Sequence, residues 1–61
     1  MFRRSLYAVA DIAAGETLTS ANIRSIRPGH GLAPTHLDAL LGRRARGRIA
    51  RGTPMDWSLV E

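Results

Sequence analysis

The sequence predicts a small, mostly β domain with short helical turns and an internal pseudo-two-fold repeat. The chain has only 61 residues, its short apolar segments are separated by turns containing Gly or Pro, and two of its segments resemble each other. A chain of this length buries only about 60% of its unfolded surface, so its core is thin. We therefore expect residues 1–61 to form a single domain.

The repeat relates the two halves of the chain. Segment 11–18 (DIAAGETL) aligns with segment 48–55 (RIARGTPM) at an offset of 37 positions, which places Gly15 opposite Gly52. In each half a short strand ends at an Ile-Ala pair, and the glycine that follows occupies a turn position that favours positive φ. Because the apolar positions agree as well, we expect both halves to contribute to one shared core.

Each half then continues into a single helical turn. Thr19 and Asp56 stand at equivalent positions, and each can cap the three residues that follow it. Such turns are too short to be stable alone, so the apolar residues after them, Ile23 and Val60, must pack into the core. We expect Trp57 to cover the core rather than bind a ligand.

Two strands and one longer helix complete the predicted elements. Alternation is blurred over Leu6–Ala10, which is typical of a strand covered on both faces. Arg24–Arg27 alternates polar and apolar residues, as a half-buried strand does. The helix is predicted over residues 34–42, with a Pro near its start, Thr35 and Asp38 as a capping pair, and a Gly at its end.

Composition argues against several classes of function. The chain has no Cys, and its two histidines have no neighbouring cluster of carboxylates, which argues against disulfides and a structural metal. No apolar run approaches the roughly 18 residues of a membrane span, and none follows Met1–Arg4 as a signal peptide requires. No Ser, His or paired-carboxylate arrangement marks a catalytic site, so none is predicted.

The charge is basic and concentrated late in the chain. The net charge is +4, and all nine basic residues are Arg. Five of them form a cluster: Arg43, Arg44, Arg46, Arg48 and Arg51. No aromatic residue interleaves with them, which disfavours nucleic-acid binding. We interpret the cluster as a solvated, charged edge strand, with binding to an acidic partner surface as the alternative.

The segment IRPGHG, residues 26–31, is the candidate binding loop. Pro28 fixes its own φ and favours an extended Arg27, while the two glycines permit tight backbone shapes. Such a loop can present the Arg27 guanidinium, a planar donor fork suited to carboxylate, phosphate or carbonyl oxygens. The simpler interpretation is a solvated Arg at the lip of a turn, with His30 as an exposed loop residue.

Several motifs, in order, resemble the C-terminal antifreeze-like (SAF) domain of the sialic acid synthase family. They are RSLY, DIxxGE, NIRSIRPGxGL, LG and IxRGTP. The resemblance covers about residues 4–60. The forms RSIRPGxGL and GTPxxWxL are more similar to the pseudaminic acid synthase branch than to the N-acetylneuraminate branch.

This resemblance implies a β-clip fold with internal pseudo-symmetry, as in type III antifreeze proteins, although the many arginines disfavour ice binding. In the family, an N-terminal barrel with a divalent metal condenses phosphoenolpyruvate with an N-acetylated amino sugar in a cytoplasmic homodimer. The small domain caps the partner's barrel, and the Arg of the Arg-Pro-Gly motif, here Arg27, contacts the amino sugar. The resemblance thus implies a domain without catalytic residues, cofactor or membrane contact of its own. A free-standing interaction module is the alternative, and His30 inherits no role.

Overall fold

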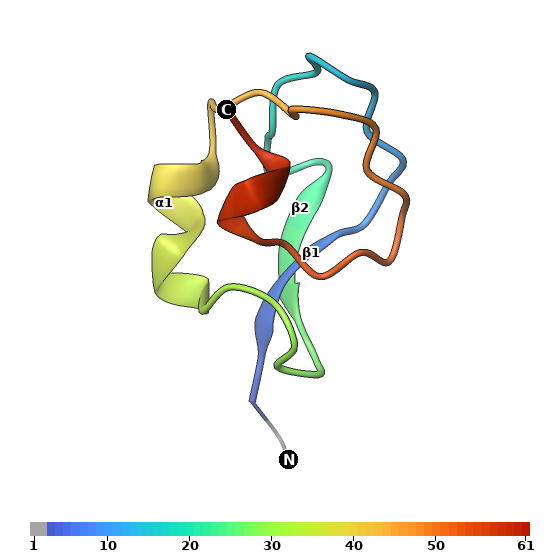
Figure 1. The fold of residues 1–61 in the computed structure, drawn as a ribbon. Helices are drawn as coiled ribbons and strands as arrows, with labels where there is room; N and C mark the ends of the chain where they lie inside the picture. Colours follow the sequence, from blue (N-terminus) through green and yellow to red (C-terminus); the bar gives the residue numbers. More distant parts are fainter. Residues whose placement is uncertain (1–2) are drawn as a thin grey trace.

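Two antiparallel strands run through the computed structural model, which describes residues 3–61 (Figure 1). β1 (Ser5–Ala8) pairs with β2 (Ile23–Ile26), with Ala8 opposite Ile23. Each strand begins one residue earlier than predicted. All of β1 is buried, which confirms a strand covered on both faces. The half-buried pattern predicted for β2 is wrong at its end, because Ile26 is 38% exposed.

The helical segment between the two halves is shorter and less regular than predicted. It consists of a 3-10 turn, η1 (Pro34–His36), followed by a single α-helical turn, α1 (Leu37–Leu40). The predicted capping pair of Thr35 and Asp38 is wrong, because no side chain caps the N-terminus of η1 or of α1. Pro at the first position, with its fixed φ, begins the segment instead. Gly42 follows it with φ of +90°, as expected of a helix stop.

The helical turn near the C-terminus forms as predicted. η2 (Trp57–Leu59) is a 3-10 turn capped by Asp56, whose carboxylate accepts a hydrogen bond from the Ser58 N–H at 3.0 Å. Residues 20–22 of the first half form a hydrogen-bonded turn instead of a helix. The Thr19 hydroxyl accepts a backbone N–H there at 3.2 Å, so its capping role is confirmed.

Backbone hydrogen bonds at equivalent positions join the two halves. The N–H of Gly15, in the first half, donates to the second half. The N–H of Gly52, 37 positions later, donates to the first half. The matched donors and acceptors are Gly15 N to Ala45 O, Gly52 N to Ala8 O, Ile12 N to Ile49 O, and Ile49 N to Ile12 O. Gly15 and Gly52 have φ values of +82° and +91°, which confirms the two predicted turns.

One hydrophobic core is shared by both halves, as expected. Its buried members are Leu6, Ala8, Ile12, Leu18, Ile23, Leu40, Ala45, Ile49, Met55 and Val60. Ile23 and Val60, which follow the two turns, are 1% and 3% exposed. Trp57 is 39% exposed at the surface, so it covers the core less than predicted.

The Arg-rich segment 43–51 is exposed at each of its arginines. The predicted edge strand is wrong, because this segment makes only isolated bridges: Thr17 with Arg44, Ala45 with Val60, and Ile12 with Ile49. Ala45 and Ile49 of this segment turn inward to the core, whereas its arginines lie outside.

Among the described residues, no helix has the length and apolarity needed to cross a bilayer. Met1 and Phe2, which begin the segment considered as a leader, lie outside the part of the chain that the structure describes.

Candidate functional site: the Arg27–Gly31 loop

The candidate loop, Arg27–Gly31, follows β2 and lies at the end of the molecule where the chain begins (Figure 1). It starts with a cis peptide bond between Arg27 and Pro28. Arg27, Pro28 and His30 are exposed, whereas the two glycines between and after them are partly buried. The loop therefore turns its backbone toward the core and its larger side chains outward.

Ser5 holds the loop against the domain. Its side chain is only 1% exposed, and its hydroxyl donates to the Pro28 carbonyl and accepts from the Gly31 N–H, both at 2.9 Å. One buried hydroxyl thus pairs two backbone groups that lie on either side of Gly29 and His30. A buried group left unpaired would cost about 1–3 kcal/mol, so this double hydrogen bond favours a single loop conformation.

Gly31 is packed too closely for any side chain. A Cβ atom there would collide with the backbone oxygen of Leu6 and would lie 2.9 Å from the nitrogen of Met55. The next residue, Leu32, donates to Met55 O and accepts from Leu6 N, each at 2.9 Å. The end of the loop is therefore inserted between β1 and the second half of the domain.

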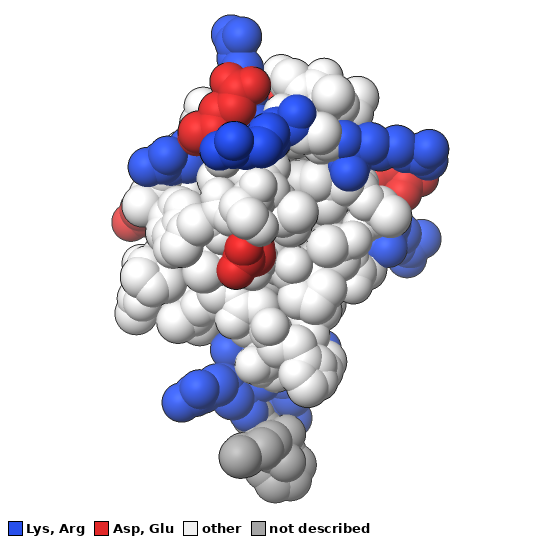
Figure 2. Space-filling model, viewed as in Figure 1, with Lys and Arg blue, Asp and Glu red and all other residues white. Residues whose placement is uncertain are grey.

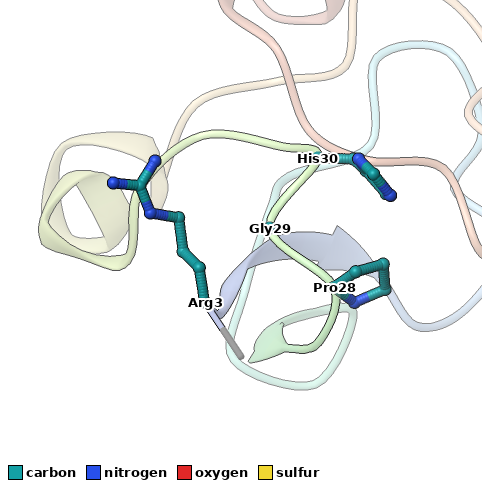
Figure 3. A pocket seen from close by; sticks show the side chains of 4 residues that line it. All are labelled: Arg3, Pro28, Gly29 and His30. Carbon is teal, nitrogen blue, oxygen red and sulfur yellow. The ribbon is translucent and has the colours of Figure 1, made fainter. Parts of the chain in front are cut away.

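A pocket of about 330 Å³ opens beside the loop, lined by Arg3, Pro28, Gly29 and His30 (Figure 3). The side chain of Arg3 comes so close to Gly29 that a Cβ atom there would lie 2.8 Å from the Arg3 Cγ. Figure 3 shows the Arg3 guanidinium on one side of Gly29 and the His30 imidazole on the other. In this view the two polar side chains extend to opposite sides of the loop backbone.

The surrounding surface is basic. Figure 2 shows Arg side chains at the end of the molecule where the chain begins, and no acidic side chain beside them in this view. Within residues 3–61, no group of three or more His, Cys, Asp or Glu could hold a metal ion. The loop can bind and orient a ligand by hydrogen-bond donation from guanidinium groups, which have no acceptor capacity.

Sequence reasoning identified Arg27 but missed the residues that shape its surroundings. Arg27 directly precedes Pro28, which is the first residue of the loop that lines the pocket. Ser5 gave a weak signal, since it is a polar residue at the start of an otherwise apolar strand. Nothing in the sequence indicated that Arg3, from another segment, would line the same pocket as His30.

A second surface cluster was also missed. Trp57 meets the edge of His36, with ring centroids 5.6 Å apart, and the guanidinium of Arg43 lies 5.3 Å from the Trp57 ring centroid. Arg43 is fixed further by donating to the carbonyls of Ala39 and Glu61 at 2.9 and 3.1 Å. His36 is exposed and does not line the pocket.

The fold and the loop together define a small, mostly β domain with an exposed arginine directly after β2. Residues 3–61 match the family of the SAF domain. The chain belongs to this family, and the sequence resemblance to it is confirmed.

Known relatives sharpen this assignment. The chain is 38% identical over 60 residues to the pseudaminic acid synthase of Helicobacter pylori, covering 98% of this chain and 18% of that protein. It is 44% identical over 52 residues to the pseudaminic acid synthase of Campylobacter jejuni, covering 85% of this chain and 15% of the relative. It is also 28% identical to the N,N'-diacetyllegionaminic acid synthase of Legionella pneumophila, over all of this chain and 17% of that protein.

A solved structure agrees with the fold. The spore coat polysaccharide biosynthesis protein spsE of Bacillus subtilis superposes with a TM-score of 0.87 at 32% identity, covering 98% of this chain and 18% of that one. The chain thus spans less than one fifth of each of these proteins. What it is similar to is one domain of a sialic-acid-type synthase.

Proposed function

We propose that this chain is the substrate-capping domain of a synthase that condenses phosphoenolpyruvate with an N-acetylated amino sugar. The observation that carries the proposal is the similarity of almost the whole chain to pseudaminic acid synthases, at 38% and 44% identity. The legionaminic acid synthase is less similar, at 28%, which favours a pseudaminic-type product. The catalytic barrel would lie outside these residues, since the relatives are more than five times longer.

In this proposal, Arg27 reaches the amino sugar bound in the barrel of the partner subunit of a homodimer. Its place in a loop fixed by Ser5 supports this role, because a fixed backbone directs a long side chain to one region. A guanidinium there orients the sugar and polarises its carbonyl for attack. Such contacts contribute to the rate without any proton transfer by this domain.

The barrel would also supply the divalent metal and the phosphoenolpyruvate site, in a cytoplasmic enzyme. Within residues 3–61, the carboxylates and imidazoles do not gather into a group that could hold a metal ion. The absence of Cys is compatible with a reducing compartment.

We also propose that the domain is a β-clip with pseudo-two-fold symmetry. The matched backbone bonds support this: Gly15 N to Ala45 O and Gly52 N to Ala8 O are related by the offset of 37 positions. The bridge between Tyr7 and Pro54 has its counterpart between Arg44 and Thr17 in the same way.

The test is Arg27→Ala in the complete synthase. We expect kcat/KM for the amino sugar to fall about a hundredfold or more, as for loss of one oriented donor, while KM for phosphoenolpyruvate stays constant. Far-UV circular dichroism verifies that the variant keeps its fold. Arg48→Ala is the matched control, because Arg48 is an exposed arginine of the second half. Unchanged kinetics in Arg27→Ala would contradict the role of this residue, and turnover by the 61-residue chain alone would contradict a non-catalytic domain.

The alternative, a free-standing interaction module, draws on the exposed arginines of segment 43–51. Figure 2 shows a band of basic side chains at the end of the molecule opposite the chain start, with acidic side chains among them. This mixture weakens the field expected for a polyanion site. Salt-dependent binding to an acidic protein or nucleic acid would support the module, whereas an upstream in-frame barrel would support the synthase.

A further inference from the structure

We propose that Ser5 is a positioning residue for Arg27, and that the aliphatic stem of Arg3 completes the support of the same loop. This role rests on the proposed function, because positioning is measured through the effect of Arg27 on the reaction of the amino sugar. It gives two residues at the start of the described chain a part in the rate of the synthase, although neither is assigned a contact with the reacting atoms.

Ser5 can act on the reaction only through the loop. Its side chain is 1% exposed, so a ligand at the surface does not reach it. Its hydroxyl has a single O–H, which is used in the 2.9 Å hydrogen bond to the Pro28 carbonyl. The same oxygen accepts from the Gly31 N–H at 2.9 Å. Any effect of this side chain on turnover must therefore pass through the loop backbone.

Ser5 holds the chain on both sides of Arg27. The backbone of Ser5 lies opposite Ile26, the residue before Arg27, in the antiparallel pair of β1 and β2. The hydroxyl of Ser5 holds the carbonyl of Pro28, the residue after Arg27. Because both neighbours of Arg27 are tied to one buried residue, Ser5 sets the direction in which the Arg27 side chain leaves the backbone.

The stem of Arg3 packs on the loop between the two hydrogen bonds of the Ser5 hydroxyl. A Cβ atom on Gly29 would lie 2.8 Å from the Arg3 Cγ and 2.9 Å from its Cβ and its Cδ. The carbon chain of Arg3 thus covers Gly29 closely, while its guanidinium points away from Gly29 in Figure 3. Long charged side chains commonly pack their stems in this way and keep the charged end in water. Arg3 therefore restricts the part of the loop that Ser5 bridges.

The chain after the loop is held independently of the Ser5 hydroxyl. Leu32 accepts a hydrogen bond from the Leu6 N–H and donates one to the Met55 carbonyl, each at 2.9 Å. Loss of the hydroxyl should therefore release the backbone around Arg27 while Leu32 and the core keep their places. A misplacement of about 1 Å in a group that orients a substrate can cost about a hundredfold in rate, so a local release of this kind is measurable in the kinetics.

The experiment is a double-mutant cycle between Ser5→Ala and Arg27→Ala in the complete synthase. We expect Ser5→Ala to lower kcat/KM for the amino sugar about tenfold, because the guanidinium is present but less well oriented, and to leave KM for phosphoenolpyruvate constant. In the Arg27→Ala background, Ser5→Ala should have no further effect, since the side chain that it positions is gone. A loss of folded enzyme would instead lower the rate by the same factor in both backgrounds.

Further variants grade the effect and separate packing from charge. Ser5→Cys keeps a side chain of similar size with a weaker donor and acceptor, so its kcat/KM should lie between that of the parent enzyme and that of Ser5→Ala. If Ser5→Ala does not fold, the cycle with Arg27→Ala is measured with Ser5→Cys. Arg3→Met keeps most of the stem without the charge and should retain kcat/KM within about twofold, whereas Arg3→Ala should lower it about threefold or more.

Ser25→Ala is the matched control, because it is the same substitution in the paired strand, opposite Leu6, and it should leave the kinetics unchanged. If Ser5→Ala leaves kcat/KM unchanged, or lowers it by the same factor with and without Arg27, the positioning role is overturned. The proposed function then still stands if Arg27→Ala alone impairs the enzyme, and it fails if Arg27→Ala has no effect. Equal losses in Arg3→Met and Arg3→Ala would overturn the role of the Arg3 stem.

Discussion

The Arg27–Gly31 loop and the turns at Gly15 and Gly52 all depend on glycine, but for different physical reasons. Gly15 and Gly52 have positive φ values, and a Cβ atom at either would meet nothing within 4 Å. Gly31 has no positive φ, yet a Cβ atom there would collide with the backbone of Leu6. The turns therefore need glycine for conformation, whereas the loop needs it for space.

This difference shows how the two regions are specified. A turn of positive φ is set by local chain geometry, and the residues beside it can change without loss of its shape. The loop is set by contacts with segments distant in sequence, through the Ser5 hydroxyl and the hydrogen bond from the Leu32 N–H to the Met55 carbonyl. The orientation of a loop residue such as Arg27 is thus a property of the assembled domain.

The strongest way to test this comparison is to add one methyl group in each region. Gly31→Ala should lower the free energy of unfolding by about 3 kcal/mol, because backbone atoms cannot yield as a flexible side chain can. Gly52→Ala should cost only about 1–2 kcal/mol, the strain of a non-glycine residue in left-handed backbone. Urea unfolding of both variants measures the two losses.

A loss in Gly52→Ala equal to or larger than that in Gly31→Ala would contradict the comparison. Gly15→Ala serves as the control, because Gly15 has a similar φ of +82° and the same open space. Its loss should match that of Gly52→Ala.

The turns could be predicted from the sequence because they depend on local chemistry. The packing of the loop could not be predicted, because it depends on segments that are distant in the sequence. Gly15 and Gly52 follow Ile-Ala pairs at equivalent positions, so local chemistry and the repeat were sufficient to predict their turns. Predicting the tight site at Gly31 requires knowing that the Met55 segment lies beside β1. The Arg-Pro-Gly pattern could indicate that Arg27 is presented, but the pocket between Arg3 and His30 depends on the same long-range packing.

The prediction of a regular, capped helix over residues 34–42 failed for a different reason. Thr35 and Asp38 have the spacing of a capping pair, but the chain enters through Pro34 as a 3-10 turn, which changes the register of the first N–H groups. The sequence pattern gave the presence of the segment and its end at Gly42, while its inner geometry depended on how Leu40 packs in the core.

Removing the Ser5 hydroxyl tests the long-range part of the comparison. Ser5→Ala leaves the Pro28 carbonyl and the Gly31 N–H without this partner, and we expect a loss of about 1–3 kcal/mol in unfolding free energy. Hydrogen exchange at the Gly31 amide should accelerate more than exchange at the Gly52 amide. Ser25→Ala, in β2 opposite Leu6, is the control and should change stability by less than about 0.5 kcal/mol. Equal acceleration at both glycines would mean that Ser5 stabilises the whole domain instead of the loop.

The smallest effect is expected at a local cap, where pH reports the interaction. Hydrogen bonds from the Ser58 hydroxyl and then from its backbone N–H lower the pKa of the fully exposed Asp56. A carboxyl whose pKa is lowered by folding stabilises the fold above its unfolded pKa of about 4, and this contribution is lost as pH falls through the lower folded value. The thermal midpoint of Asp56→Ala should therefore lie below that of the parent chain at pH 7, and the two should converge in acid. Asp38→Ala, which removes a carboxylate that caps no helix, is the control and should leave the thermal midpoint at pH 7 nearly unchanged. The effect is small because solvent screens the charge of an exposed group. If the difference in thermal midpoint between Asp56→Ala and the parent chain persists unchanged to pH 2, the cap acts without its charge.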